Sequence, residues 1–326
     1  MNPVPRPTLR YLSRRDIESL GITMAEVVAI VEDVFREKGA GRAQMPPKID
    51  LHPSGDGFIH AMPGYLPARG AAGMKWISGF PANRERGLPY ISGLIVLNDP
   101  ATGLPVAVMD ATWITAMRTG AATAVAARYL ARRDSRSVGI VACGVQGRSN
   151  LEALGCVFDL ERVIAFDVRP EAARAFADEA GAQFGLDATV TADVRDAVAT
   201  DIVVTSGPIR RTPRPTIPAG WLEPGAFACP LDFDSYWQGE ALAEAHKLAT
   251  DDVPQMAHFR QLGFFRDTPV PYADLGEIVA GTKPGRESDD EITVSINLGL
   301  ALEDVAVGAA VLDRATGRGV GSELET

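Results

Sequence analysis

The sequence predicts an α/β protein with two parts, a doubly wound parallel sheet domain and a mixed α+β domain. Before about residue 115, short strand-like runs follow one another with turn residues between them. After that point, helical and strand-like patterns alternate, which is typical of a parallel sheet. The 326 residues are also enough for about two domains.

The N-terminal part begins with a helix signal. Thr23 and Glu26 form a capping box, and the apolar spacing predicts a helix to Lys38 that ends at Gly39. Strand-like runs separated by Gly, Pro and Asn-Asp turns follow it: Pro47–Leu51, Phe58–Met62, Gly73–Ile77, Ile91–Leu97 and Val106–Met109. Strands without long helices between them predict an antiparallel or mixed sheet.

The second part begins with an Ala-rich helix, predicted over Trp113–Arg132 and broken only at Gly120. Strands and helices then alternate, with helices expected from Gln146 and Pro170. The predicted strands are Ser137–Ala142, Arg162–Phe166, Ala188–Thr191 and Asp201–Thr205. The tail, Ile292–Leu312, predicts a strand followed by a helix.

Composition excludes several classes of function. The net charge of −10 argues against nucleic acid and against an anionic membrane surface, because both need a basic face. No apolar run reaches the ~18 residues of a membrane span, and the N-terminus has no apolar core of a secretory signal. Cys143, Cys156 and Cys229 match no disulfide or metal spacing. We therefore expect a cytoplasmic protein without a structural metal.

The strand ending at Ala142 runs into Ala142-Cys143-Gly144-Val145-Gln146-Gly147, a G-x-G-x-x-G loop with Ala in the first position. Small residues there let the backbone approach a pyrophosphate at a helix N-terminus, as in a Rossmann-type domain. Ala142 suggests a φ angle that a Cβ tolerates. Asp167 ends the next strand, 20 residues after Gly147, and suits a ribose 2′-hydroxyl. It favours NAD over NADP, whereas Arg169 could meet a phosphate.

Two cations stand among apolar residues, Lys75 in a strand and Arg118 in a helix, and Lys48 is a weaker third candidate. If buried, each needs an anion; otherwise its chain snorkels to solvent. Asp232 and Asp234 follow an apolar strand and are candidates for proton transfer. His60 is a rival acid–base group, although a satisfied strand histidine is the commoner case.

Together these residues resemble the ornithine cyclodeaminase/mu-crystallin family. The segments that carry the resemblance are Gly73–Lys75, Met117–Thr119, Gly144–Arg148, Tyr272–Gly281, Gly285–Arg286 and Gly299–Asp304. They occur in the family's order over nearly the whole chain. The resemblance is specific for the family but not for one activity.

The resemblance implies a Rossmann domain over 116–299 and a substrate-binding and dimerisation domain made of 1–115 with 300–326. Lys75 and Arg118 would then hold the substrate carboxylate with Lys48 as a third cation, and Asp232, with Lys75, would be catalytic. Asp234, two residues after Asp232, is the alternative match for the family's catalytic acid. The cofactor-binding residues would be Thr119, Gly144, Val145, Gln146, Gly147, Asp167, Arg169 and Thr205.

The family also implies the chemistry. We expect a homodimeric, NAD-dependent amino-acid dehydrogenase or imine/ketimine reductase that transfers a hydride at the α carbon of an amino or imino acid. Members that cyclise ornithine carry an acid near the position of His60, and a histidine is a poor partner for a distal ammonium. The alternatives are an ammonia-releasing cyclodeaminase that recycles NAD internally, and an NAD(P)H-binding crystallin-like protein without turnover.

Overall fold

The computed structural model describes residues 8–53 and 55–325. It divides into two compact units. Unit 1 contains the described residues up to Arg118 together with those from Leu300 onward, and unit 2 is Thr119–Gly299. The division falls three residues after the boundary expected from the sequence, inside helix α3 (Thr112–Leu130).

Unit 1 is built on a mixed seven-stranded sheet with the order β15-β1-β6-β5-β4-β3-β2. The strands from β2 to β6 pair antiparallel with their neighbours in this order, and β1 runs parallel to β6. The strands are β1 (Thr8–Leu12), β2 (Ile49–Leu51), β3 (Phe58–Leu66), β4 (Ala71–Gly79), β5 (Ile91–Asn98), β6 (Pro105–Asp110) and β15 (Ser322–Glu325). The predicted mixed sheet is confirmed, with β1 and β15 as additions.

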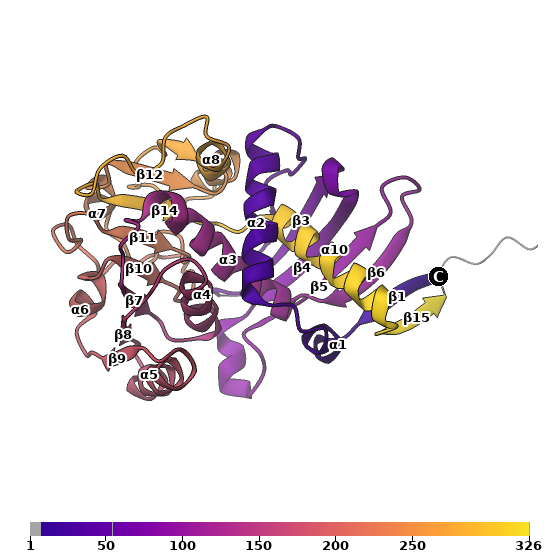
Figure 1. The fold of residues 1–326 in the computed structure, drawn as a ribbon, viewed down its shortest axis with the longest axis horizontal. Coiled ribbons are helices and arrows are strands. Elements are labelled where there is room, and N and C mark those ends of the chain that lie inside the picture. Colours follow the sequence, from indigo (N-terminus) through magenta and orange to yellow (C-terminus); the bar gives the residue numbers. More distant parts are fainter. Residues whose placement is uncertain (1–7, 54, 326) are drawn as a thin grey trace, which may run out of the picture. The chain divides into compact units, whose positions relative to one another are not determined.

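Helix α10 (Ala301–Arg318) covers one face of this sheet and lies across β3, β4 and β5, and helix α2 (Met24–Gly39) packs against α10 (Figure 1). The predicted capping box at Thr23 is present and starts α2. A short helix, α1 (Arg14–Ser19), and the 3₁₀ helices η1 (Pro67–Arg69) and η2 (Pro81–Arg86) complete unit 1. Because side chains alternate along a strand, β3, β4 and β5 each turn every second residue toward α10.

Unit 2 is built on an eight-stranded sheet with the order β13-β12-β14-β11-β10-β7-β8-β9, and all its strand pairs are parallel. Its strands are β7 (Ser137–Val141), β8 (Arg162–Phe166), β9 (Asp187–Val190), β10 (Ile202–Thr205), β11 (Phe227–Pro230), β12 (Lys247–Thr250), β13 (Ala273–Asp274) and β14 (Thr293–Ile296). The predicted parallel sheet is confirmed. The carboxyl ends of these strands meet at one edge, where ligands bind in sheets of this kind.

The helices of unit 2 after α3 are α4 (Val145–Gly155), α5 (Pro170–Phe184), α6 (Val194–Val198), α7 (Gly239–Ala243), α8 (Val253–Gln261) and α9 (Leu275–Val279). The predicted break at Gly120 is wrong, because α3 passes through it without interruption. A Cβ at Gly120 would lie 2.3 Å from the backbone oxygen of Ser149 in α4. Glycine is therefore needed for the close approach of two helices and not for a bend.

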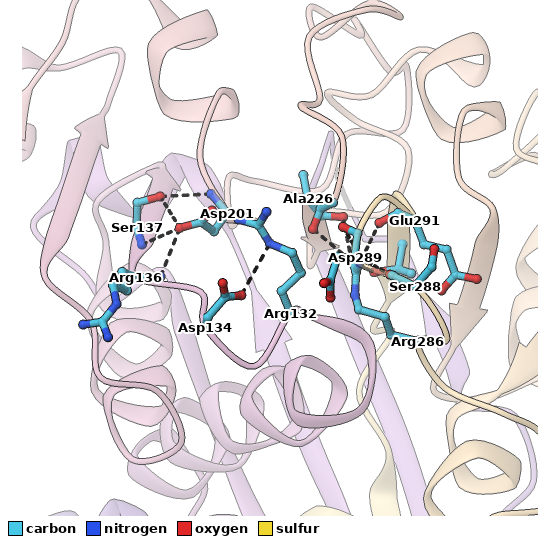
Figure 2. Close-up of polar contacts among 12 residues, drawn as sticks. Arg132, Asp134, Arg136, Ser137, Asp201, Ala226, Arg286, Ser288, Asp289 and Glu291 are labelled. Atoms are coloured by element: carbon cyan, nitrogen blue, oxygen red, sulfur yellow. Dashed lines mark hydrogen bonds and ion pairs between the residues drawn. The ribbon is translucent and has the colours of Figure 1, made fainter.

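The opposite, amino edge of this sheet is tied together by side chains that bond to the backbone (Figure 2). Arg286 donates to the carbonyl oxygens of Leu130, Gly225 and Glu291. Asp201 accepts from the amide and hydroxyl of Ser137. Arg286, part of the resemblance, thus joins backbone segments of unit 2 that are distant in sequence. Within the described ranges, no helix is both long and apolar enough to cross a bilayer.

Candidate functional site

In unit 1, Lys75 lies in the middle of β4 on the face that α10 covers. It pairs in register with Met62 of β3 and Ile95 of β5, both buried. Its ammonium is 2.6 Å from a carboxylate oxygen of Asp304, and the two side chains are 1% and 0% exposed. Lys75 therefore does not snorkel to solvent; it is a buried cation with an anionic partner, as burial of a charge requires.

Arg118 joins the same ion-pair group from α3. Its guanidinium bonds Asp304 at 3.0 Å and Glu303 at 3.1 Å. Both acids belong to the first turn of α10, where the helix dipole favours negative charge. The predicted pair Lys75 and Arg118 is thus brought together, through two carboxylates that sequence reasoning left without a role.

The pKa of Lys75 falls to about 7, mainly because of burial and also because of the positive charge of Arg118, while Asp304 opposes the shift. An ammonium in this setting gains or loses its proton close to neutral pH. An anion that binds nearby would therefore change the protonation of Lys75, since a nearby negative charge raises the pKa of an ammonium.

Lys48, the third predicted cation, is 5% exposed, and its charge acts on both Lys75 and His60. His60 on β3 pairs in register with Asp50 on β2, and its Nε2 lies 2.7 Å from the Asp50 carboxylate. Burial lowers the pKa of His60 to about 4, so the imidazole is neutral at pH 7. The ring also stacks on Phe58. Asp50 was not selected from the sequence. A usable signal was that Asp50 alternates with Lys48 along one predicted strand, with the buried His60 on the next strand.

In unit 2, the loop after β7 differs from the sequence expectation at its first position. Ala142 has φ = 76°, in the left-handed region that disfavours a side chain. The expectation of a φ that a Cβ tolerates is therefore wrong. The turn keeps the geometry that glycine normally supplies, and it is held by hydrogen bonds from Ala142 N–H to Phe166 O and from Ser206 to Ala142 O.

The remaining loop residues suit a bound pyrophosphate. Gly144 is the N-cap of α4 without a side-chain cap, and a Cβ placed on it would meet no atom within 4 Å. A Cβ on Gly147 would lie 2.9 Å from the Ala142 oxygen, so that glycine allows the helix to approach the strand. Val145 is 68% exposed at the start of the helix. An open backbone and an uncapped helix N-terminus together fit a phosphate group.

Asp167 follows β8 beside this loop. One carboxylate oxygen accepts from Cys143 N–H and the other from Arg169 N–H, each at 2.9 Å. The carboxylate is thus fixed at the position expected for a ribose-binding acid. The guanidinium of Arg169 lies 3.7 Å from it, so this cation is paired with Asp167 itself.

The remaining predicted cofactor residues lie in different settings. Gln146 is in the first turn of α4, and its carbonyl accepts from Asn150 Nδ2. Thr119 lies on α3 next to Gly120, the residue that contacts α4. Thr205 ends β10 and is fully buried. Its hydroxyl donates to Asp232 and so does not point into open space.

Asp232 follows β11 and is 0% exposed. It accepts from the Thr205 hydroxyl at 2.9 Å and from Gly207 N–H at 3.1 Å. Burial raises its pKa to about 7, against the effect of these two hydrogen bonds. The carboxyl group can therefore take up or release a proton near neutral pH, as a general acid or base must.

Asp234, in the same segment, bonds to the protein backbone. Its carboxylate accepts from Phe265 N–H at 2.6 Å and so holds the backbone after α8. The intervening Phe233 has φ = 59° and packs against Phe259, Phe264 and Phe265. The structure thus places Asp232 at the sheet edge and Asp234 in a backbone contact.

Asn297, which sequence reasoning did not select, follows β14 and is 5% exposed. Its Oδ1 accepts from Ser295, and its Nδ2 has no hydrogen-bond partner among the described residues. Its backbone N–H bonds Pro230 O, two residues before Asp232. Its place directly after an apolar strand, like that of Asp167 and Asp232, was the signal that could have identified it.

Comparison with known proteins shows the family to which the chain is similar. The family model of the ornithine cyclodeaminase/mu-crystallin family matches residues 10–319. The chain is 40% identical to an alanine dehydrogenase of Archaeoglobus fulgidus, with 96% of this chain and 97% of the relative covered.

Two solved structures are similar over nearly their whole length. One is an archaeal alanine dehydrogenase dimer with bound NAD (TM-score 0.88, 38% identity, 98% of this chain and 99% of that chain covered). The other is Δ1-pyrroline-2-carboxylate reductase of Thermococcus litoralis with NADH and L-proline (TM-score 0.88, 35% identity, 96% and 99% covered). With its buried cation group, its dinucleotide loop and a match along almost the entire sequence, this chain belongs to the ornithine cyclodeaminase/mu-crystallin family.

Proposed function

We propose that the protein is an NAD-dependent oxidoreductase that transfers a hydride at the α carbon of an amino acid or its imine. The observation that carries this proposal is Asp232, a buried acid with a pKa of about 7 at the edge of the sheet that also bears the dinucleotide loop. The similarity to an alanine dehydrogenase and to a pyrroline-carboxylate reductase supports the same class of reaction.

The substrate carboxylate is assigned to Lys75 and Arg118, with Lys48 as the third cation. Lys75 and Arg118 are paired with the two carboxylates Glu303 and Asp304, and the positive charge of Lys48 acts on Lys75 in addition. A carboxylate added beside these cations raises the pKa of Lys75 from about 7, which favours the ammonium. Substrate binding and protonation of Lys75 are therefore coupled.

NAD fits the loop at 142–147 and Asp167, and when bound it supplies the hydride acceptor, or as NADH the hydride donor. Asp232 takes the proton from the substrate amino group during oxidation, or from the water that attacks the imine carbon. In the reductive direction it returns a proton to nitrogen. The fixed cations stabilise the carboxylate while the charge at the neighbouring carbon changes.

The test is a screen in which NADH absorbance and ammonia release are both measured. L-Alanine with NAD, Δ1-pyrroline-2-carboxylate with NADH and L-ornithine with NAD form its three arms. Sustained formation or consumption of NADH supports the proposal. NAD binding without turnover of any amino acid, 2-oxo acid plus amine, or cyclic imine contradicts it and leaves a crystallin-like binding protein. Arg118→Ala should raise the KM of the active substrate, while Arg14→Ala, an exposed pair on α1, should leave it unchanged.

A second candidate is a cyclodeaminase, and Asp50 is the observation that favours it. Its side chain is 5% exposed and is paired with neutral His60, on which the charge of Lys75 also acts, so an acid is available for a distal ammonium. Ammonia release from L-ornithine without net NADH, abolished in Asp50→Asn, supports this reading. Unchanged ornithine kinetics in Asp50→Asn exclude a role for Asp50 in binding that substrate.

We also propose a homodimer through the sheet face of unit 1 opposite α10. Trp76 and Leu94 pair in register on that face and are 42% and 44% exposed. The similar archaeal alanine dehydrogenase is a dimer. Sedimentation should give a dimer for the native chain and a monomer for Trp76→Glu. A native monomer at micromolar concentration contradicts this assignment.

A reducing compartment such as the cytoplasm is proposed from the thiols. All three cysteines are free, with Cys143 and Cys229 buried and Cys156 exposed. Free exposed thiols persist where disulfide formation is suppressed. Cell fractionation tests this directly, and recovery of the protein in an oxidising compartment contradicts it.

A further inference from the structure

A tryptophan is linked by hydrogen bonds to the acid that we assign to proton transfer. Trp237 Nε1 donates to Thr205 Oγ1 at 3.0 Å, and Thr205 Oγ1 donates to Asp232 Oδ1 at 2.9 Å. The three side chains belong to residues that are 2%, 0% and 0% exposed. They form a continuous row of hydrogen bonds from the core of unit 2 to the carboxyl group.

The direction of this row follows from the chemistry of its members. An indole nitrogen can only donate, and a hydroxyl has one proton and two acceptor sites. Because Trp237 occupies an acceptor site of Thr205, the hydroxyl proton is left to point at Asp232. We propose that Trp237 is a positioning residue for the proton-transfer step, acting through Thr205 to keep a hydrogen-bond donor on Asp232. The proposal rests on the proposed function only in the role given to Asp232.

Trp237 is itself well anchored. Its backbone forms a parallel bridge with Ile217, and Trp237 belongs to a buried apolar cluster of unit 2. At the other end of the same segment, Phe233 is held by three aromatic rings despite its positive φ. The segment that bears Asp232 is therefore fixed on both sides, so the indole cannot follow Thr205 into another rotamer without disturbing the core.

Several other groups act on Asp232 or on its immediate neighbours. They come from four segments of unit 2 and are Asp167, Arg210, Asp251 and, in the stretch around Asp232 itself, Cys229, Asp234 and Tyr236. Asp234 raises the pKa of Asp232, whereas Arg210 is paired with Tyr236. Thr205 and Gly207 are the neighbours that donate hydrogen bonds to the carboxylate, so the Thr205 donor has a direct effect on proton affinity.

Removing the indole donor frees the Thr205 hydroxyl to rotate, and the carboxylate of Asp232 then loses part of its stabilisation. The pKa of Asp232 should rise in Trp237→Phe by roughly 0.5–1 unit, and in Thr205→Val by about 1–2 units, because a hydrogen bond to a charged group is lost. Thr205→Ser keeps the hydroxyl and should restore the native value. A purely packing role for Trp237 would lower stability without moving the pKa.

The first experiment compares the pH dependence of kcat in the native enzyme, Trp237→Phe and Trp221→Phe. Trp221 packs on the same apolar cluster and is the matched control. We expect an upward shift of the midpoint in Trp237→Phe and none in Trp221→Phe. The same midpoint in all three proteins overturns the proposal.

The second experiment needs no turnover. The carboxyl carbon of Asp232 is titrated by NMR in protein labelled at aspartate, with Asp232→Asn identifying the signal. An upward shift of the carboxyl pKa in Trp237→Phe and Thr205→Val, with recovery in Thr205→Ser, supports the proposal even if no substrate is turned over. An unchanged carboxyl pKa in Thr205→Val overturns it, including when Trp237→Phe fails to fold. Absence of turnover with a shifted carboxyl pKa contradicts the proposed function alone.

Discussion

The ammonium of Lys75 lies 2.6 Å from the carboxylate of Asp304, and both side chains are buried. The two residues are 229 positions apart, so the cation of the early strand β4 depends on the first turn of the last helix. The C-terminal segment thus supplies unit 1 both with the helix that covers Lys75 and with the carboxylates that pair with Lys75 and Arg118.

Asp304→Asn should therefore destabilise the protein. Breaking a buried ion pair by removing one partner costs about 3–5 kcal/mol, because the other charge stays buried. The measurement is the free energy of unfolding from urea denaturation. Glu18→Gln, which removes one partner of an exposed pair with Arg14, should cost less than about 1 kcal/mol. Equal effects of the two substitutions would contradict the role given to Asp304.

Asp232→Asn should lower kcat by roughly 10²–10⁴, since the amide cannot accept or release the proton. Asp234→Asn is the comparison, because that carboxylate holds Phe265 N–H and lies outside the proposed chemistry. Asp234→Asn should lower the free energy of unfolding, and its effect on kcat should be smaller than that of Asp232→Asn. A native kcat in Asp232→Asn would remove Asp232 from the mechanism.

Asp232 should also make stability depend on pH. Its pKa is about 7 in the folded protein and 3.8 as a free side chain, so the folded state binds more protons between these values. The resulting stabilisation is complete below pH 3.8 and is lost as the pH rises through 7. It amounts to roughly 4 kcal/mol over this range. Urea denaturation at a series of pH values should show that the free energy of unfolding of the native protein falls as the pH rises. In Asp232→Asn this slope should be smaller by the equivalent of about one bound proton.

Ala142→Gly should stabilise the protein. The left-handed φ of 76° costs a residue with a Cβ about 1–2 kcal/mol, and glycine has no such penalty, although it gains freedom when unfolded. We expect a net gain of up to about 1 kcal/mol by chemical denaturation. Ala153→Gly, within α4, should instead lose about 1 kcal/mol. A loss at both positions would mean that Ala142 is unstrained.

Gly120→Ala should separate α3 from α4. The added Cβ would lie 2.3 Å from the backbone oxygen of Ser149, which cannot move without shifting the helix. Overpacking of this kind costs typically about 1–3 kcal/mol. Gly155→Ala at the end of α4 meets no atom within 4 Å and should be neutral or stabilising. A thermal unfolding series that ranks Gly120→Ala as stable as Gly155→Ala would contradict the proposed close contact.

Much of unit 2 could be predicted from local patterns. The alternation of apolar strands and helices was enough for the parallel sheet, and the spacing from Gly147 to Asp167 predicted a candidate dinucleotide loop and an acid that the structure holds beside it. These features depend on neighbours in sequence, because a strand, a turn and a helix form one continuous segment. The φ of Ala142 was not predictable in this way, since the turn from β7 into α4, with Ala142 N–H bonded to Phe166 O, holds the residue in a conformation that it disfavours.

The amino-acid sequence by itself determined the fold class, the loop at 142–147 and the choice of Lys75, Arg118 and Asp232 as candidates. Tertiary structure alone decided which anions neutralise the cations and which donors face the acid. Asp304 reaches Lys75, and Trp237 reaches Asp232 through Thr205, only after the chain has folded back on itself. Burial then sets the proton affinities of Lys75 and Asp232, and burial depends on packing between distant segments, which no local pattern contains.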